Sequence, residues 1–238
     1  MKYALITGAS GGIGRQIAKS LASEGFSLYL HYHKNEQSID ELRKELSHTE
    51  TWKVKADLAT KTGVRNILDA INTPIDVLIL NSGNSYVGLL TDMRDTEIEE
   101  MLQLHLTSSI LLTKALLPTM VQKKTGNIVA ISSIWGLTGA SCEVMYSTVK
   151  GGLNTFVKAL AKEVAPSGIR VNGVAPGVIA TNMLAGFSRD EIEILCEDIP
   201  MGRLGEPKEV AELVTFLISN KSAYLNGQII SINGAWYC

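Results

Sequence analysis

The sequence predicts an α/β fold, a single-domain Rossmann-type doubly wound parallel β-sheet with helices on both faces. Short apolar runs alternate with longer amphipathic segments along all 238 residues. The runs lack the polar alternation of half-exposed strands, which is typical of parallel strands covered on both faces. A glycine-rich segment follows the first run directly, where this fold places its phosphate-binding loop.

The elements follow one another in the order that such a fold requires. Strands are predicted at Tyr3–Ile6, Leu28–Tyr32, Thr51–Lys55, Val77–Leu80, Ile128–Ile131, Ile169–Val174 and Gln228–Ile232. Helices are predicted at Ile13–Glu24, Ser38–Leu46, Val64–Ile71, Glu97–Gln122, Tyr146–Val164 and Pro207–Ser219. Because the sequence shows no linker-like tract, charge block or repeat, residues 1–238 are interpreted as one domain. Residues 181–200 break the alternation, and we expect them to form a small helical lid.

Composition restricts the partners and the compartment. The net charge of −2 and the pI near 6.1 provide no general attraction for nucleic acid or an anionic membrane. Cys142, Cys196 and Cys238 are scattered and form no CxxC pair, which predicts no disulfide framework and no metal site. The first strand leads straight into the glycine loop without a signal-like segment, and uninterrupted apolar stretches such as Val77–Leu80 are far shorter than the roughly 20 residues of a membrane span. We expect a soluble, cytoplasmic protein.

The glycine loop, with Gly8, Gly12 and Gly14, lies between a predicted strand and a predicted helix. Glycine allows a tight turn and lets backbone amides approach a pyrophosphate at the positive end of the helix. The spacing is GxxxGxG rather than GxGxxG, and three glycines can also form only a tight turn. The strand-to-helix context favours dinucleotide binding.

The end of the second strand indicates which dinucleotide is bound. In NAD-binding folds an acidic residue there holds the ribose 2′-hydroxyl, but this sequence has His31, Tyr32, His33 and Lys34. A basic surrounding suits the 2′-phosphate of NADP, with His33, Lys34 and Arg15 as candidate partners. Each of these residues could instead be an ordinary solvated side chain. NADP(H) is the predicted cofactor.

Three residues predict carbonyl chemistry. Ser133 follows a predicted strand, and Tyr146 and Lys150 are spaced i, i+4 so that they share one helix face. A tyrosine with a pKa near 10 is an acid whose pKa a neighbouring cation lowers, so Lys150 is expected to lower the pKa of Tyr146. Ser133 would hold the carbonyl oxygen. A tyrosine and a lysine at this spacing are common on helix surfaces, so the prediction depends on the serine and the glycine loop as well.

In this combination the sequence resembles the short-chain dehydrogenase/reductase family, and within it the 3-oxoacyl-[acyl-carrier-protein] reductases. The resemblance runs from Tyr3 to Tyr237. It rests on Thr7–Gly14, Asp57-Leu58, Asn81-Ser82-Gly83, Ser133, Tyr146 to Lys150, Pro176-Gly177-Val178-Ile179, Thr181 and Asn226 to Gly234.

The resemblance implies roles for these positions. Asp57 and Leu58 would border the adenine, Asn81 and Gly83 would lie near a ribose, and Lys150 would also bind the nicotinamide ribose. Ile179 and Thr181 would contact the nicotinamide amide. The full predicted cofactor set is Gly8, Ser10, Gly12, Ile13, Gly14, Arg15, Tyr32, His33, Lys34, Asp57, Leu58, Asn81, Ser82, Gly83, Tyr146, Lys150, Pro176, Gly177, Ile179 and Thr181. The resemblance also implies a homotetramer.

The sequence departs from the family pattern at several positions. Ser82 stands in the segment that is usually Asn-Asn-Ala-Gly, and Gly11 replaces an arginine of many NADP-using relatives, although Tyr32 matches some of them. Ser167 replaces an arginine that bacterial relatives use to dock the acyl carrier protein, whereas Lys124 matches another basic docking position. An acyl carrier protein is therefore a candidate partner, with no docking residue at one of the two positions.

His105 occupies the position of the family's catalytic asparagine, which orders a water in the proton relay. A histidine in an apolar helix is otherwise a satisfied core residue, so both roles stay open. If His105 relays protons, turnover should show an ionisation near 6.5, displaced by burial or by Lys150. Glu143, Trp135 and Met145 are expected at the substrate mouth, although Glu143 could equally be a solvated loop carboxylate.

The predicted function is NADP(H)-dependent reduction of a carbonyl to an alcohol by hydride transfer. The catalytic residues would be Ser133, Tyr146, Lys150 and His105, and 3-oxoacyl thioesters of fatty acid metabolism are the leading substrate class. The alternatives are a reductase of another small ketone, quinone or sugar carbonyl, and an NADP-binding regulatory protein with impaired catalysis.

Overall fold

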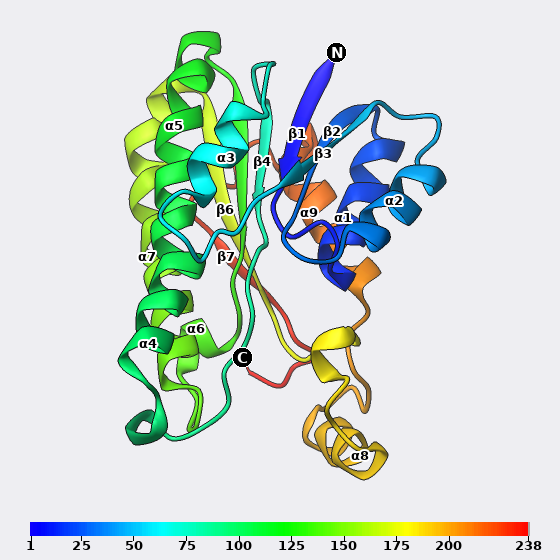
Figure 1. Ribbon diagram of the computed structural model, residues 1–238, viewed down its shortest axis with the longest axis vertical. Coiled ribbons are helices and arrows are strands. Elements are labelled where there is room, and N and C mark those ends of the chain that lie inside the picture. The colour runs from blue at the N-terminus through cyan, green and yellow to red at the C-terminus, as the bar shows by residue number, and fades with distance from the viewer. Residues whose placement is uncertain (238) are drawn as a thin grey trace.

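The computed structural model describes residues 1–237 and has a parallel β-sheet at its centre (Figure 1). Within these residues the sheet has seven strands in the order β3-β2-β1-β4-β5-β6-β7, all paired in parallel. The strands are β1 (Lys2–Ile6), β2 (Phe26–Tyr32), β3 (Thr51–Lys55), β4 (Val77–Leu80), β5 (Gly126–Ile131), β6 (Ile169–Pro176) and β7 (Ile229–Ile232). This is the predicted doubly wound sheet, and the predicted fold class is confirmed.

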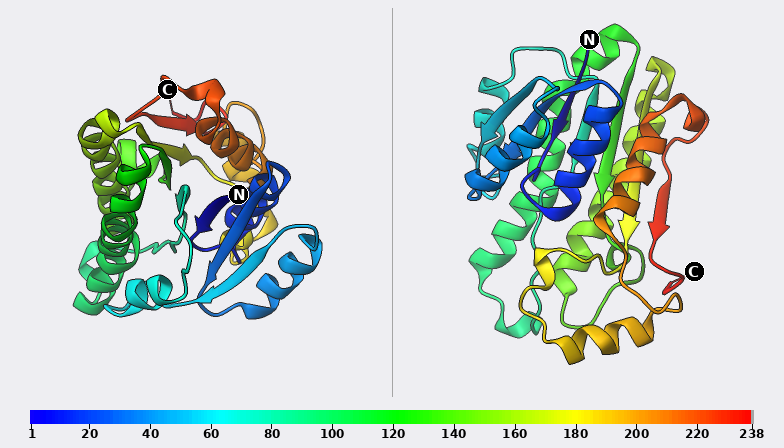
Figure 2. Two further views of the ribbon diagram at one scale, coloured as in Figure 1. Left: turned by 90° about the horizontal axis from the view of Figure 1, so that it is seen from above. Right: turned by 90° about the vertical axis from the view of Figure 1, so that its right-hand side faces the viewer.

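Helices cover both faces of the sheet, as the view from above shows (Figure 2). One face is covered by α1 (Gly12–Ser23), α2 (Glu36–Glu45) and α9 (Pro207–Ile218), and the other by α3 (Gly63–Asp69), α5 (Ser108–Lys123) and α7 (Val144–Val164). Shorter helices are α4 (Asp95–Met101), α6 (Trp135–Thr138) and α8 (Arg189–Asp198). Each helical layer buries its apolar stripe against the sheet.

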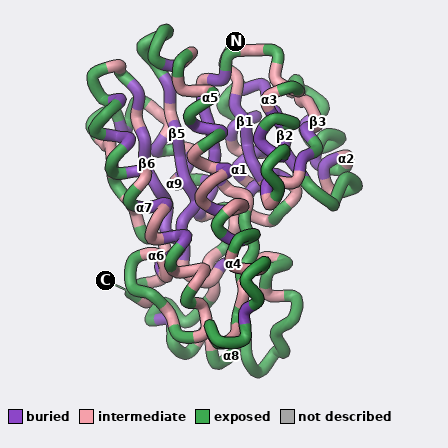
Figure 3. The backbone as a smooth tube through the Cα atoms, turned by 60° about the vertical axis from the view of Figure 1, so that its left-hand side comes forward, coloured by how far each residue is buried: buried purple, intermediate pink, exposed green. Residues whose placement is uncertain are grey.

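The two cores follow from the alternation of side chains along each strand. On β1, Ala4 and Ile6 pack in the core beneath α1 and α9, whereas Leu5 between them packs in the core beneath α3, α5 and α7. All three are fully buried, so this central strand reads as a continuous apolar run. Figure 3 shows the same buried centre within an exposed outer layer.

The strand order places a ligand site at the carboxyl edge of the sheet. β1 has β2 on one side and β4 on the other, so the connections after β1 and β3 run to opposite sides. Such a reversal opens a crevice beyond the carboxyl ends of the strands, where doubly wound proteins bind ligands. In Figure 1 this edge is the lower one, and α6, α8 and the C-terminal segment lie there.

Most predicted elements are observed with ends shifted by one to two residues, but the predicted helix Glu97–Gln122 is not uniform. Residues Leu102–Thr107 between α4 and α5 form a π-helical turn, labelled η2. Such turns are frequent at functional sites because they re-aim side chains within an otherwise regular helix. His105 lies in this turn.

The long helix through α4, η2 and α5 also corrects the expectation about apolar length. Asp95–Lys123 contains an 18-residue window of mean hydropathy 1.3, so it is long and apolar enough to cross a membrane by length and composition alone. In the structure Leu112 and Met120 are fully buried against the sheet core, while 28% of the window is buried overall. An expectation based only on uninterrupted apolar runs overlooked this helix, whose outer face exposes apolar side chains.

The predicted lid region contains a short 3-10 helix at Asn182–Leu184 and then α8. Ser188 caps α8 in a capping box with Glu191, and none of the residues Arg189–Asp198 is buried. Figure 1 shows α8 standing away from the sheet. The segment begins at Thr181, which packs on the glycine loop.

Candidate active site

The glycine loop connects β1 to α1, and its geometry requires glycine at two positions. Gly8 has φ +67°, a left-handed conformation that side chains rarely adopt. A Cβ on Gly14 would lie 2.2 Å from the Gly8 carbonyl oxygen and 2.8 Å from Asn81 Nδ2. The loop therefore folds back on itself, as a backbone cradle for phosphate at the start of α1 requires.

Side chains directly after β1 and β4 hold this loop. Thr7 Oγ1 accepts hydrogen bonds from the backbone amides of Asn81 and Ser82 at 2.8 and 3.0 Å. Asn81 Nδ2 donates to the carbonyl oxygens of Thr7 and Gly8 at 2.9 and 3.1 Å. The Asn81 amide is thus committed to the loop, and its predicted place near the ribose stays a prediction.

The predicted 2′-phosphate partners lie around the end of β2, but they are not equally free. Arg15 forms an ion pair with Glu45 and donates to the Ser38 carbonyl oxygen at 3.0 Å. His33 lies 3.6 Å from the Asp57 carboxylate, and Lys34 is exposed. Lys34 is therefore the residue of this predicted group whose charge is least engaged within the described chain.

The remaining adenine-side residues are placed by packing. Tyr32 is buried, and this burial, with the Glu36 hydrogen bond as a smaller cause, raises the pKa of the Tyr32 phenol. Leu58 is buried, and its carbonyl oxygen accepts a hydrogen bond from Ser108 Oγ at 2.7 Å. Ser10 accepts a hydrogen bond on its carbonyl oxygen from Ser38 Oγ at 3.1 Å. The Ser10–Ser38 contact connects the glycine loop to α2, and the Leu58–Ser108 contact connects the segment after β3 to α5.

The segment after β6 closes over the glycine loop from the other side. A Cβ on Gly12 would lie 2.8 Å from Thr181 Cγ2, so glycine is needed where the two segments meet. Ile179 is buried and pairs with Gly205 through an isolated parallel bridge. Gly177 donates its backbone N–H to the Ile232 carbonyl oxygen at 2.9 Å. The predicted nicotinamide-side residues and the predicted pyrophosphate loop are thus adjacent.

Ser133, Tyr146 and Lys150 converge at the carboxyl edge of β5, as the sequence predicted. The Tyr146 phenol hydrogen-bonds Ser133, whose Oγ also accepts the Trp135 backbone N–H at 3.2 Å. Lys150 is buried, and its Nζ donates to the Ile131 carbonyl oxygen at 2.8 Å and lies 5.6 Å from the centre of the Tyr146 ring. Two hydroxyls and one cation therefore meet where a carbonyl oxygen can be held.

The electrostatics of this group correct one expectation. Lys150 was predicted to lower the pKa of Tyr146, but burial raises that pKa to about 12, and the charge of Glu143 adds to the effect. The Tyr146–Ser133 hydrogen bond opposes the shift without cancelling it. Burial also lowers the pKa of Lys150 to about 8. Burial is therefore the main cause of both shifts, and Tyr146 is held as a neutral acid.

His105 is buried and its ring contacts that of Tyr146. Its ring lies edge-on to that of Tyr146, with centroids 5.7 Å apart, and a Cβ on Gly83 would lie 2.6 Å from His105 Cε1. His105 Nε2 lies 3.1 Å from Asn84 Oδ1 and 3.4 Å from the Asn84 backbone nitrogen. Nδ1 is one of the buried side-chain atoms without a hydrogen-bond partner among the described residues.

Burial, and after it the charge of Lys150, lowers the pKa of His105 to about 3. The imidazole is therefore neutral throughout the working range. The expected ionisation near 6.5 is displaced far to acid pH, because a buried ring beside a cation resists a second positive charge. A neutral ring with an unpartnered Nδ1 can still hydrogen-bond a water.

The region predicted to be the substrate mouth is aromatic. Trp135 hydrogen-bonds the half-buried Glu143, and burial raises the pKa of that carboxyl. The rings of Trp236 and Tyr237 lie with their centroids 5.3 and 5.6 Å from the Trp135 ring. Met145 packs beside Tyr146 in a small apolar cluster. The C-terminal segment thus contributes to a wall only two residues from Ser133.

The two positions considered for carrier docking lie elsewhere. Lys124 ends α5 in a left-handed conformation just before β5 begins, and the Lys124 carbonyl oxygen would meet a Cβ on Gly168 at 2.6 Å. Ser167 precedes β6 at the same edge. Both lie at the amino ends of strands, roughly 20 Å along β5 from Ser133. Neither faces the active site of its own chain.

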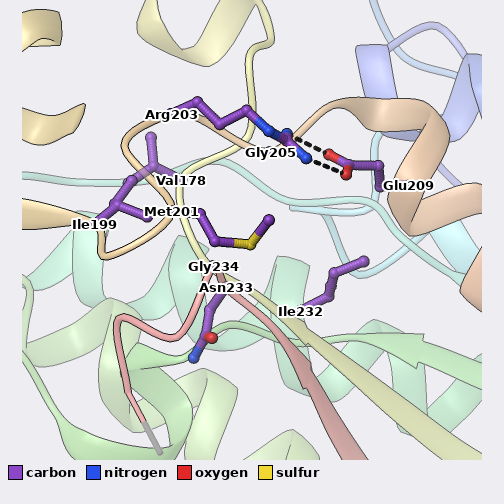
Figure 4. Close-up of a pocket in the computed structure, with 9 residues that line it drawn as sticks. All are labelled: Val178, Ile199, Met201, Arg203, Gly205, Glu209, Ile232, Asn233 and Gly234. Carbon is purple, nitrogen blue, oxygen red and sulfur yellow. Dashed lines mark hydrogen bonds and ion pairs between the residues drawn. The ribbon is translucent and has the colours of Figure 1, made fainter.

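A separate pocket lies on the side of the predicted lid, and its lining does not include the Ser133–Tyr146–Lys150 group. Figure 4 shows it between the segment after β6 and the end of β7, with Met201 and Ile232 on its walls and Arg203 paired to Glu209 at 2.7 and 2.9 Å. None of the predicted catalytic residues lines it.

Over residues 1–237 no group of three or more His, Cys, Asp or Glu residues is placed to hold a metal ion. Cys142 and Cys196 are free thiols, and Cys238 lies outside the described residues.

Sequence reasoning missed four residues of this region. Thr7, His31 and Asn84 act through hydrogen bonds to segments distant in sequence, and Trp236 reaches Trp135 from the C-terminal segment. The one available signal was position, because Thr7, His31 and Asn84 each lie near the end of a predicted strand. Their partners could not be identified without the strand order.

Comparisons with known proteins agree with this geometry. A family model described as Enoyl-(Acyl carrier protein) reductase matches residues 8–235. The chain is 50% identical over 240 residues to the uncharacterized oxidoreductase YmfI of Bacillus subtilis, with 100% of this chain and 99% of that protein covered. It is 37% identical to the 3-oxoacyl-[acyl-carrier-protein] reductase FabG of Aquifex aeolicus, with 99% and 97% covered.

A second FabG reductase, from Escherichia coli, is 35% identical, with 99% of this chain and 97% of that protein covered. A solved structure of YwfH, an NADPH-dependent reductase involved in bacilysin biosynthesis, superposes with a TM-score of 0.92 at 25% identity over 99% of this chain and 98% of that one. These relatives confirm the oxidoreductase class and support NADP(H) as the cofactor. The chain belongs to the short-chain dehydrogenase/reductase family.

Proposed function

We propose that this protein is an NADP(H)-dependent reductase that converts a ketone to an alcohol, with 3-oxoacyl thioesters as its leading substrate class. The observation that carries the proposal is the Tyr146–Ser133 hydroxyl pair beside the buried Lys150, next to a glycine loop shaped for a dinucleotide. A pure binding module would need the loop but not the proton donor. Retention of both favours an enzyme over a regulatory protein.

In the proposed mechanism the substrate carbonyl oxygen accepts hydrogen bonds from Ser133 Oγ and the Tyr146 phenol. NADPH supplies a hydride to the carbonyl carbon when bound. Tyr146 gives its proton to the oxygen, so the C=O bond becomes an alcohol and the tyrosine becomes a phenolate. The Lys150 ammonium stabilises this phenolate until a proton returns from solvent. A raised pKa of Tyr146 suits the acid role, because it keeps the phenol protonated until transfer.

The residues fit NADP(H) in two respects. The loop through Gly8, Gly12 and Gly14 leaves no space for side chains at its contacts, as a pyrophosphate cradle requires. Lys34 is free to meet a 2′-phosphate, whereas Arg15 would first have to leave Glu45. We propose Lys34 as the main contact and Arg15 as a secondary one, with a preference for NADPH over NADH.

The mouth favours an apolar carbonyl substrate among the alternatives. Trp135, Trp236 and Tyr237 form an aromatic wall beside the catalytic serine, and an acyl chain or a quinone ring buries well against such a surface. A sugar carbonyl would leave its hydroxyls facing this wall. The relatives named FabG act on 3-oxoacyl-[acyl-carrier-protein], which is the basis for placing thioesters ahead of quinones.

A carrier protein as partner has weaker support from this chain alone. Lys124 is exposed, but it lies at the edge of the sheet opposite to Ser133. A carrier docked on Lys124 could reach only the active site of another protomer. We therefore propose carrier docking together with a homotetramer, in a soluble cytoplasmic enzyme of fatty acid metabolism.

The test is a panel of carbonyl substrates followed by the loss of NADPH absorbance. Carrier-linked 3-oxoacyl thioesters, their coenzyme A and N-acetylcysteamine analogues, quinones, simple ketones and sugars are compared at equal concentration. The proposal expects the highest kcat/KM with 3-oxoacyl thioesters, and at least tenfold lower efficiency with NADH. Faster turnover of a quinone would replace 3-oxoacyl thioesters with quinones as the substrate class. Tight NADPH binding without any turnover would favour the regulatory alternative.

A further inference from the structure

One buried histidine has no part in the proton chemistry. His31 lies on β2, and 2% of it is exposed. Its Nδ1 accepts the backbone N–H of Gly8 at 3.0 Å, and its Nε2 lies 3.2 Å from the Ala56 carbonyl oxygen. Ser82 Oγ lies 3.4 Å from the same Nδ1. One side chain therefore touches the loops that follow β1, β3 and β4.

These contacts fix the tautomer of the ring. Nδ1 faces a backbone N–H and so acts as an acceptor, while Nε2 faces a carbonyl oxygen and so carries the hydrogen. Burial lowers the pKa of His31 to about 4, with the charge of His33 contributing and the Ala56 contact and Asp57 opposing. A proton on Nδ1 would set two donors, the imidazolium N–H and the Gly8 N–H, against each other.

The Gly8 peptide is the pivot of the glycine loop. Gly8 has φ +67°, and its carbonyl oxygen accepts hydrogen bonds from the Gly11 N–H at 3.1 Å and from Asn81 Nδ2 at 3.1 Å. The carbonyl oxygen of His31 also accepts the backbone N–H of Ala9 at 2.8 Å. His31 thus holds two successive amides of the loop, one through its backbone and one through its side chain.

We infer that His31 is a positioning residue for dinucleotide binding, which holds the Gly8 peptide in the orientation that shapes the phosphate cradle. The inference rests on the proposed function, since it concerns the nucleotide that function requires. His31 acts on the pyrophosphate loop and not on the 2′-phosphate, so its loss should weaken NADPH and NADH equally. It touches neither Ser133 nor Tyr146 in any described contact, so turnover at saturating nucleotide should be preserved.

Two amide substitutions separate the two contacts of the ring. In His31→Asn the side-chain amide can place an acceptor near the position of Nδ1, which keeps the Gly8 contact and loses the Ala56 contact. In His31→Gln the longer amide can donate to Ala56 but has carbon at the Nδ1 position, so it loses Gly8. Each variant gives up one buried hydrogen bond, so their melting temperatures should fall by similar amounts.

The measurement is the dissociation constant for NADPH and for NADH, followed by nucleotide fluorescence at a temperature well below unfolding. His31→Gln should bind both nucleotides at least tenfold more weakly, with their ratio unchanged, while His31→Asn stays within threefold of wild type. Tyr29→Phe is the control on the same strand, because it removes a buried hydroxyl that bonds Thr73 at 3.0 Å and makes no contact with the loop. It should lower stability and leave both affinities unchanged.

The outcomes separate this inference from the proposed function. Equal affinities for His31→Gln and wild type, or equal losses in both amide variants, would overturn the positioning role while leaving the enzyme intact. Wild type that binds neither nucleotide would overturn both. Should His31→Gln fail to fold, the wild-type protein decides by NMR without nucleotide: a protected Gly8 amide and an unprotonated His31 Nδ1 are expected, and a freely exchanging Gly8 amide would reject the inference.

Discussion

Lys150 is a proposed catalytic residue whose buried charge lowers the stability of the fold. Its ammonium is buried, with one described hydrogen bond from Nζ, to the Ile131 carbonyl oxygen, and burial lowers its pKa from 10.5 to about 8. A base with a depressed folded-state pKa binds its proton more weakly in the native than in the unfolded chain, so the charged form destabilises the fold below pH 8. The proposed mechanism requires that charged form.

Lys150→Met should therefore abolish turnover and stabilise the protein at pH 7. Burying the ammonium lowers the free energy of unfolding of wild type by at most about 3 kcal/mol, and losing the Lys150–Ile131 hydrogen bond lowers that of the variant by about 1 kcal/mol. The variant should therefore be more stable by about 1 to 2 kcal/mol. Chemical denaturation of both proteins at pH 7 measures the difference. Between pH 8 and 10.5 wild type loses the proton and gains stability, so the difference should shrink. A methionine variant less stable at pH 7, or a difference constant with pH, would contradict this prediction.

His105 offers a second test at the scale of one residue. Because its pKa lies at about 3, the imidazole stays neutral, and we expect it to act through its unpartnered Nδ1 rather than through a change of charge. His105→Asn keeps a polar side chain and should leave kcat within about tenfold, with the same pH profile from 5 to 9. His105→Leu removes both ring nitrogens and should lower kcat further, by about a hundredfold.

Steady-state rates at saturating NADPH over this pH range provide the comparison. Loss of an ionisation near 6.5 in His105→Asn would show that the histidine does change charge during turnover. Full activity in His105→Leu would instead make it a residue of the core.

The sequence predicted which of the proposed catalytic residues meet, but not how their surroundings shift their pKa values. Tyr146 and Lys150 share a helix face by spacing alone, and Ser133 follows a strand whose carboxyl end had to face them. The predicted direction of the Tyr146 pKa shift was wrong, because the shift depends mainly on how far the folded chain buries the phenol, which spacing along one helix does not show. His31 was overlooked for a similar reason, since its ring reaches Gly8, which lies 23 residues away.

Among the elements, the glycine loop makes the sharpest demand on local geometry. A methyl group on Gly14 would overlap the Gly8 carbonyl oxygen at 2.2 Å, which is backbone and cannot turn aside. Gly14→Ala should thus deform the loop and weaken NADPH binding by at least tenfold, a cost of about 1.4 kcal/mol or more. Fluorescence titration with NADPH is the measurement.

Gly186→Ala is the matched control, because a Cβ there would meet no atom within 4 Å. It should bind NADPH as wild type does. A Gly14→Ala variant with wild-type affinity for NADPH would contradict this prediction, because it would show that the loop can accommodate a methyl group at position 14.

Element type and order were predictable because apolar runs and amphipathic periods differ clearly along the chain. The π-helical turn at Leu102–Thr107 was not, since an inserted residue within a helix barely changes the apolar pattern. The local sequence pattern also predicted a helix in the lid region. It could not predict where the lid segment lies, because that depends on the contact between Thr181 and Gly12.

At the scale of the molecule, the outer face of α5 points to assembly. Leu111 and Val121 on α5 are 40% and 39% exposed, and Leu102 just before it is 36% exposed, on a helix of high mean hydropathy. A homotetramer would cover this face. Light scattering should give four times the 25.7 kDa chain mass, and Leu111→Lys should shift the protein to smaller species. A monomeric wild type would contradict the assembly and, with it, carrier docking through Lys124.

The central claim is that Tyr146 is the proton donor in a carbonyl reduction that uses NADPH. Tyr146→Phe removes one hydroxyl and keeps the ring that packs beside His105, while Tyr224→Phe removes a hydroxyl from a fully exposed side chain. The most direct measurement is NADPH oxidation with a 3-oxoacyl thioester by these two variants and wild type, together with NADPH affinity. The account predicts a loss of about a hundredfold to ten-thousandfold in kcat for Tyr146→Phe, with unchanged affinity and an unaffected Tyr224→Phe. Turnover by Tyr146→Phe within a few-fold of wild type would contradict it.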